Sequence, residues 1–305
     1  MKRFTGLRKI EVIDKQKGIT FPMFVMYPTD VPSKSAAFGP YTLDVSPGAP
    51  IEAGRFPLVI ISHGSGGSNL AYHTLGSYLA KNGFVVCMPE HPFNNRNDNH
   101  LEGTNENFTN RLRHISLVID QLFSTDIFLQ HLQPNNIAMV GHSIGANTAL
   151  VLAGGHPISY AEYQMKFGQT IHMGQESQDV RLATDNRIKA IVLFALTPGW
   201  FTGKESLNNV EIPVLMLYAG KDEYIPYSHA EIFINGLKND HRISHRIIKN
   251  AGHFSFLSPF PESIKERVGA PARDPEGFDR EKFHQELNAG VLEFLKQSLL
   301  GIKEK

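Results

Sequence analysis

The 305-residue sequence has a single cysteine, no net charge and no apolar run as long as a membrane span. One cysteine excludes a framework of intramolecular disulfides. Cys87 lies in the apolar run of residues 84–88, which indicates a buried structural thiol rather than a nucleophile. The 30 basic and 30 acidic side chains cancel, so nothing points to a nucleic-acid or anionic-membrane partner.

The sequence contains no pattern typical of a membrane span or of a signal peptide. A spanning helix needs about 20 consecutive apolar residues, and residues 1–9 are not followed by the apolar core of a signal peptide. A hydrophobic content of 41% with 20 phenylalanines is typical of a globular protein. We therefore expect a cytoplasmic protein without a membrane span; its oligomeric state cannot be predicted from the sequence.

Short apolar segments alternate with amphipathic ones along most of the chain. This order predicts an α/β protein, in which a mostly parallel sheet carries helices on both faces. We expect one domain spanning residues 1–305, with a cap inserted at about 154–187 and a long surface loop at 28–54. The predicted strands are 7–13, 19–27, 57–62, 84–88, 136–140, 188–196, 213–219 and 242–249, and the predicted helices are 69–82, 108–132, 146–153, 227–237 and 279–299.

The most informative motif is Gly141-His142-Ser143-Ile144-Gly145. An apolar strand precedes it and a helix follows it, which is the setting of a nucleophile elbow. In such a turn the central serine is forced into a strained conformation that exposes its Oγ, and the glycines allow the strand and helix to pack closely. The motif predicts Ser143 as a nucleophile.

A nucleophilic serine needs a base, and the base needs a group that fixes its tautomer. Asp222 follows the predicted strand 213–219, and His253 follows the last predicted strand. The order Ser143, Asp222, His253 is the order of a hydrolase triad. Glu223 is a competing acid one residue further from its strand. Asp222 as a turn residue and His253 as an ordinary loop histidine are the alternatives.

An oxyanion hole requires two backbone N–H groups that face the substrate carbonyl oxygen. Ile144, directly after the nucleophile, is predicted to supply one. The sequence His63-Gly64-Ser65-Gly66-Gly67 follows an apolar strand, and Ser65 is predicted to supply the other. Ser65 is also a rival nucleophile, although it lacks the strand–turn–helix setting.

The remaining candidates are weaker. Tyr72, Phe93, Trp200 and Phe254 are aromatic candidates for the walls of a substrate pocket, with core or surface packing as the alternative. Four other histidines lack the spacing of metal ligands and are predicted to be solvated on loops or helix faces. They are His91, His100, His114 and His131. We expect neither a metal nor a cofactor.

These motifs resemble the α/β-hydrolase superfamily and, more narrowly, bacterial dienelactone-hydrolase-like proteins related to platelet-activating-factor acetylhydrolase. The resemblance covers nearly the whole chain and includes the segments 56–67, 83–92, 141–145, 251–257 and 277–284. It implies a serine esterase with the triad Ser143, Asp222 and His253. Three features depart from such relatives: a serine replaces the cysteine of dienelactone hydrolases, the acid follows a later strand than in the eukaryotic acetylhydrolase, and Ala146 replaces a common glycine.

The sequence thus predicts a metal-free hydrolase of carboxylic esters, with a small-molecule ester as substrate. An amidase, thioesterase or lactonase would use the same three residues. A hydrolase-fold binding protein without turnover and a metal-dependent hydrolase are rivals of other classes.

Overall fold

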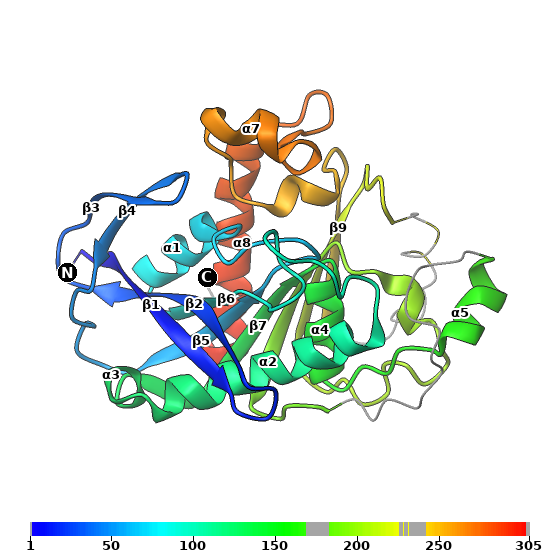
Figure 1. The fold of residues 1–305 in the computed structure, drawn as a ribbon, viewed down its shortest axis with the longest axis horizontal. Helices are drawn as coiled ribbons and strands as arrows, with labels where there is room; N and C mark the ends of the chain where they lie inside the picture. The colour runs from blue at the N-terminus through cyan, green and yellow to red at the C-terminus, as the bar shows by residue number, and fades with distance from the viewer. Residues whose placement is uncertain (1, 169–182, 226–227, 229–230, 232–241, 303–305) are drawn as a thin grey trace.

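The computed structural model describes residues 2–168, 183–225, 228, 231 and 242–302. Its described strands are β1 (Phe4–Asp14), β2 (Ile19–Thr29), β3 (Lys34–Phe38), β4 (Tyr41–Pro47), β5 (Phe56–Ser62), β6 (Val85–Pro89), β7 (Leu132–His142), β8 (Ile188–Phe194), β9 (Val214–Ala219) and β10 (Ile243–Ile248). They form one sheet in the order β10-β9-β8-β7-β5-β6-β2-β1-β4-β3 (Figure 1). Every neighbouring pair from β10 to β6 is parallel, whereas β2 pairs with β6 and with β1 in antiparallel register.

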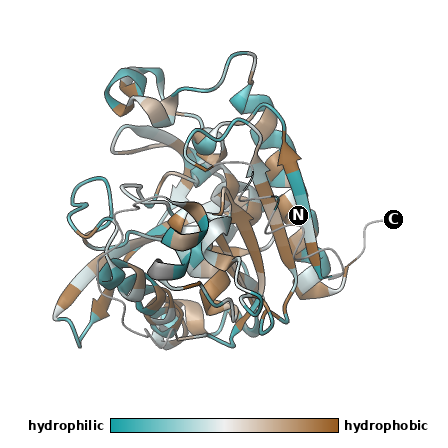
Figure 2. Cartoon of the chain, turned by 90° about the vertical axis from the view of Figure 1, so that its right-hand side faces the viewer, coloured by the Kyte–Doolittle hydropathy of each residue, from teal (hydrophilic) through white to brown (hydrophobic). Residues whose placement is uncertain are grey.

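Helices cover both faces of this sheet. The first layer contains α1 (His73–Lys81) and α8 (Arg280–Leu300), and the second contains α2 (Asn105–Ser124), α3 (Asp126–Leu129) and α4 (Ile144–Leu152). Two further helices, α5 (Tyr160–Phe167) and α7 (Glu262–Val268), lie in connecting segments, as do the 3₁₀ turns η1 (Pro198–Phe201), η2 (His253–Phe256) and η3 (Ala270–Ala272). Figure 2 shows the apolar strands enclosed between helices whose outer faces are polar.

The central strands are apolar throughout because both of their faces are covered. All seven residues of β5 are buried. Leu58 and Ile60 pack in the core beneath α2 and α4, whereas Val59 and Ile61 pack in the core beneath α1 and α8. This is the alternation of a strand with two buried faces. The predicted α/β fold with a mostly parallel sheet is confirmed.

The predicted surface loop at 28–54 is wrong, because it contains the β3–β4 hairpin. The two strands pair antiparallel, and β4 also pairs parallel with β1. Tyr41, Leu43 and Val45 are buried while Thr42 and Asp44 are exposed, an alternation typical of a half-buried strand. The prolines and glycines that flank the hairpin obscured this short pattern.

The predicted helix 108–132 is also wrong in its bounds. It begins earlier, at Asn105, where the Thr104 side chain accepts a hydrogen bond from the Asn107 N–H, and it ends at Ser124. Thr125 is extended and separates α2 from the short α3. Pro134 lies within β7, in the stretch between Leu132 and Ile137 where the pairing with β5 shifts register.

Other predicted elements agree to within a few residues, although α1 begins only at His73 and α7 was not predicted. The predicted helix 227–237 falls almost wholly outside the described residues. The same holds for the middle of the predicted cap, so the cap stays a proposal; its described part contains α5. Cys87 is buried, as predicted.

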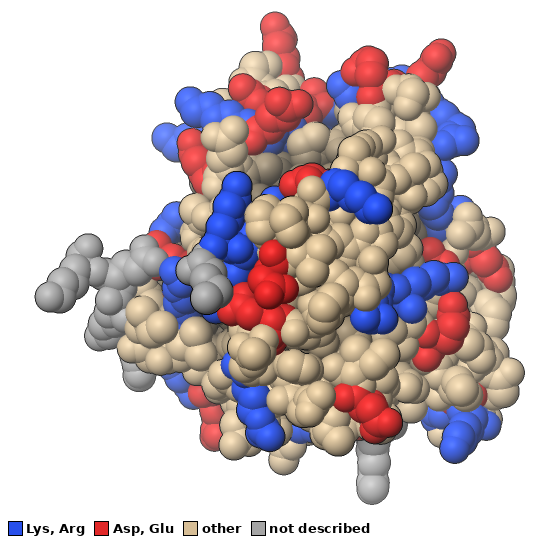
Figure 3. All heavy atoms as spheres, turned by 90° about the vertical axis from the view of Figure 1, so that its left-hand side faces the viewer, with Lys and Arg blue, Asp and Glu red and all other residues tan. Residues whose placement is uncertain are grey.

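One face of the molecule reflects the balanced charge of the sequence. On the face drawn in Figure 3, basic and acidic side chains are interspersed rather than gathered by sign. Among the described helices, none combines the length and apolarity that crossing a bilayer requires.

Candidate active site

Ser143 occupies a strained turn between β7 and α4. Its backbone has φ 55° and ψ −123°, a left-handed conformation that is costly for a residue with a side chain. Two glycines permit the turn: a Cβ at Gly145 would overlap the Ser62 carbonyl oxygen, and a Cβ at Gly141 would overlap the backbone of Gly145. The Ser143 N–H donates to the carbonyl oxygen of Phe194 at 2.9 Å, which ties the turn to β8. This backbone geometry is the one that the predicted nucleophile elbow requires.

Asp222 and His253 meet at the carboxyl ends of β9 and β10. The His253 Nδ1–H donates to Asp222 Oδ2 at 2.9 Å, and the two side chains are only 6% and 1% exposed, respectively. The other carboxylate oxygen accepts 2.9 Å hydrogen bonds from the backbone N–H groups of Tyr224 and Ile225. Since the carboxylate holds the proton on Nδ1, the Nε2 lone pair is available to accept another proton.

The competing acid, Glu223, contacts a different part of the same histidine. Its Oε2 accepts a hydrogen bond from the backbone N–H of His253 at 3.0 Å. Asp222 therefore orients the imidazole ring, while Glu223 holds the backbone that carries it.

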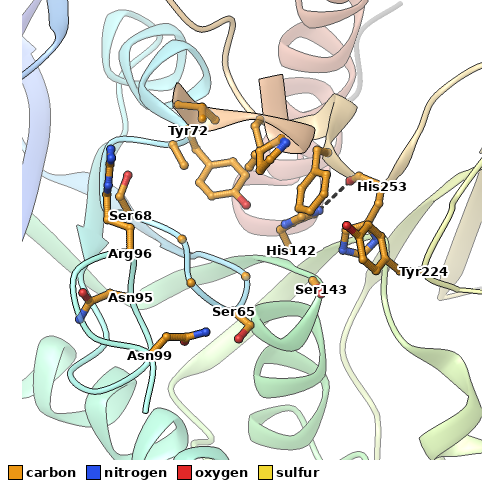
Figure 4. A pocket seen from close by; sticks show the side chains of 18 of the residues that line it. Ser65, Ser68, Tyr72, Asn95, Arg96, Asn99, His142, Ser143, Tyr224 and His253 are labelled. Atoms are coloured by element: carbon orange, nitrogen blue, oxygen red, sulfur yellow. Dashed lines mark hydrogen bonds between the residues drawn. The ribbon is translucent and has the colours of Figure 1, made fainter. Parts of the chain in front are cut away.

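His142 contacts His253 as well, a role that we did not predict from the sequence. Its Nε2–H donates to the His253 carbonyl oxygen at 2.9 Å, and the two ring centroids are 4.9 Å apart (Figure 4). Burial lowers the pKa of His142 to about 3, so the ring is neutral at pH 7. The only sequence signal was its place beside Ser143 in the glycine-flanked motif.

The two predicted oxyanion donors belong to segments that adjoin Ser143. Ile144 is the first residue of α4, and Ser65 belongs to the glycine-rich loop that follows β5. A Cβ at Gly64 would lie 3.3 Å from the Ser143 Cβ, so this loop runs directly against the elbow. Neither the Ser65 N–H nor the Ile144 N–H donates to an acceptor within the described residues.

A cavity of about 590 Å³ opens above Ser143. In Figure 4, Ser143 lies between Ser65 on one side and His253 on the other. The walls come from the predicted oxyanion loop, which comprises residues 63–67, from the loop after β6, from Tyr224 and Ile225, and from the segment 254–271 that includes α7 and η3 (Figure 1). Within its described part, the predicted cap at 154–187 contributes no lining residue.

Two of the four predicted aromatic wall residues, Tyr72 and Phe254, line this cavity. The structure puts the other two elsewhere. Trp200 is buried in the core and stacks on Tyr163 of α5, with ring centroids 4.3 Å apart. Phe93 packs against the exposed His100, with ring centroids 5.1 Å apart.

The prediction that His91 and His114 are solvated is wrong, whereas His100 is exposed as predicted and His131 is half-buried. His91 and His114 are buried beneath the oxyanion loop, with their Nδ1 atoms 3.3 Å apart. His114 lies on the face of α2 that packs on the sheet, and His91, in the loop after β6, turns inward so that its Nε2 is 2.8 Å from Ser62 Oγ; neither reaches water.

Comparisons with known proteins agree with this architecture. A family profile for the alpha/beta hydrolase fold matches residues 57–162. A ferulic acid esterase from Streptomyces cinnamoneus superposes with a TM-score of 0.68 at 19% identity, covering 99% of this chain and 92% of that chain. A dienelactone hydrolase-like promiscuous phosphotriesterase from metagenomic libraries superposes with a TM-score of 0.59 at 12% identity, covering 96% of this chain and 99% of that chain. A search of curated proteins finds no significant match.

Proposed function

Because this chain has the α/β-hydrolase fold, we propose that it is a serine esterase that hydrolyses small or short-acyl carboxylic esters. The observation that carries the proposal is the buried Asp222–His253 hydrogen bond beside the same cavity as the strained Ser143. The structural similarity to a ferulic acid esterase is consistent with ester chemistry. The narrower relationship to dienelactone-hydrolase-like proteins stays a prediction.

In the proposed mechanism Ser143 Oγ attacks the acyl carbon while His253 Nε2 takes its proton. The backbone N–H groups of Ser65 and Ile144 stabilise the negative oxygen that forms, and the dipole of α4 adds to this at its N-terminus. His253 then protonates the leaving alcohol. A water molecule activated by His253 releases the acid from Ser143, and Asp222 stabilises the imidazolium in both steps.

A substrate panel tests this function. We expect p-nitrophenyl acetate and butyrate to be hydrolysed far faster than the matched anilides, and a fluorophosphonate probe to modify Ser143 alone. Faster turnover of anilides or acyl thioesters would instead favour the amidase or thioesterase alternative. A wild-type protein that neither turns over any acyl substrate nor reacts with the probe would be a binding protein, and the proposal would fail.

Replacing each of the two acids beside His253 is expected to lower kcat by a different amount. Asp222→Asn keeps the shape but favours the wrong histidine tautomer, so we expect kcat to fall by about 10³–10⁴-fold. Glu223→Gln keeps an oxygen that can accept the His253 N–H, so we expect a fall of less than about fivefold. Steady-state kinetics on one ester compares the two variants. A larger loss in Glu223→Gln would make Glu223 the acid of the triad.

A further inference from the structure

Arg111 is a fully buried cation in the second helix layer. It is 0% exposed and lies on the stripe of α2 that packs on the sheet, one turn before Ile115. Within the described residues, no carboxylate forms an ion pair with it. Burial lowers the pKa of Arg111 to about 9, so the guanidinium still carries its charge at pH 7. Burying an unpaired charge is costly, and it calls for an explanation in function or in packing.

The guanidinium is directed at the oxyanion loop, residues 63–67. Its Nη1 donates to the His63 carbonyl oxygen at 2.8 Å and weakly to Ser62 Oγ at 3.4 Å, and its Nη2 donates to the Gly64 carbonyl oxygen at 3.3 Å. Its Nε donates to Asn94 Oδ1 at 2.8 Å. One planar cation thus binds two consecutive carbonyls of the loop.

A second set of hydrogen bonds links Arg111 to the same loop through side chains. Asn94, held by Arg111 through its oxygen, donates from Nδ2 to Ser65 Oγ at 2.9 Å. Ser65 Oγ in turn donates to Glu102 Oε1 at 2.7 Å. Arg111 therefore restrains Ser65 through both the backbone and the side chain.

The restraint fixes the direction of the predicted oxyanion donor. The Gly64 carbonyl and the Ser65 N–H belong to one trans peptide, in which the C=O and N–H bonds point in opposite directions. The carbonyl oxygen also accepts from the Gly67 N–H at 3.1 Å and from His63 Nδ1 at 2.7 Å. Because these donors hold the carbonyl toward the interior, the Ser65 N–H faces the opposite side, where Gly64, Ser65 and Ser143 line the cavity.

We propose that Arg111 is a positioning residue of this hydrolase: it holds the Gly64–Ser65 peptide in the orientation that binds the oxyanion. The proposal rests on the proposed function. The positive charge of Arg111 adds to the stabilisation of the negative oxygen, since the three histidines buried around the guanidinium are neutral. Burial lowers the pKa values of His63 and His114 to about 3 and places that of His91 well below its ordinary value.

The test compares Arg111→Met with Arg113→Met on the same helix. Arg113 pairs with the buried Asp14 at the start of the β1–β2 turn and does not line the cavity. For Arg111→Met we expect kcat to fall about 10–100-fold with KM changed less than threefold, because an interaction with the transition state alone is lost. For Arg113→Met we expect a lower Tm, since Asp14 loses its partner, with kcat within twofold of wild type.

Two further measurements separate positioning from a general loss of structure. An aldehyde or boronic acid that forms a tetrahedral adduct should bind Arg111→Met more weakly by the same factor as kcat/KM falls, while a non-reacting substrate analogue keeps its Kd. Arg111→Lys, which keeps the charge but cannot bind all the acceptors, should lose less than Arg111→Met. This variant also serves if the methionine variant does not fold.

Wild-type kcat in Arg111→Met, or an equal loss in Arg113→Met at a temperature where both are folded, would overturn the proposal. Failure of the proposed function is a separate result, seen as wild-type protein without turnover. In that case hydrogen exchange of the backbone amides at residues 64–67 decides: faster exchange in Arg111→Met than in wild type supports positioning, and an unchanged rate contradicts it.

Discussion

Replacing Ser143 with alanine is expected to lower kcat for a p-nitrophenyl ester by about 10⁵–10⁶-fold, to or below the detection limit. The loss is large because the variant has no Oγ to form the acyl-enzyme, and removing a triad serine typically costs as much as removing the whole triad. Hydrolysis is followed by release of p-nitrophenolate, and labelling by the fluorophosphonate probe should disappear in parallel.

The control is stability, since Ser143 lies in a strained turn. Alanine removes only the hydroxyl, which forms no hydrogen bond with another described residue, so we expect thermal unfolding within about 2 °C of wild type. An Ser143→Ala protein that is folded and still active would eliminate Ser143 as the nucleophile. Ser65, in the wall of the same cavity, would then be the next candidate.

The second large effect is unfolding in mild acid, which we expect between about pH 6 and pH 4.5. Burial lowers the pKa to about 3 for His63, His114 and His142, and to about 4 for His73 and His284. These histidines are neutral in the folded protein, but in the unfolded chain they take up protons below their ordinary pKa of about 6.5. Their stabilisation is complete above pH 6.5 and is lost as the pH falls from there toward 4 and 3.

The size of the loss in stability follows from the same pKa shifts. At pH 5, about 1.5 units below the unfolded pKa, each histidine favours unfolding by about 2 kcal/mol. The five together amount to about 10 kcal/mol, which is comparable to the whole stability of a typical domain, about 5–15 kcal/mol. Urea unfolding at a series of pH values measures directly the slope of the free energy of unfolding against pH.

Matched histidine variants test the cause. His284→Gln keeps a group that can donate to the Ser255 carbonyl but cannot be protonated, so the slope should fall by about 1.4 kcal/mol per pH unit. His245→Gln changes an exposed histidine on β10 and should leave this slope unchanged. A protein that keeps its neutral-pH stability at pH 4.5 would contradict this prediction.

Much of the fold and the order of the site residues could be predicted from the sequence, because the signals are local. A run such as β5 is apolar at every position only when both faces are covered, and the two glycines around Ser143 are a direct requirement of a tight strand–helix turn. Asp222 and His253 were found because each follows a predicted strand. The carboxyl ends of parallel strands meet at one edge of the sheet, so residues far apart in the chain become neighbours.

The tertiary structure decided how those residues are supported. Glu223 and His142 both bind the backbone of His253, and the segment 254–271, rather than the described part of the predicted cap, walls the cavity. Arg111 departs from the apolar pattern of its own helix, and that departure was the one available signal of its role. Its acceptors lie 47 and 48 residues away in the chain, so only the packing of α2 against the oxyanion loop brings charge and carbonyls together.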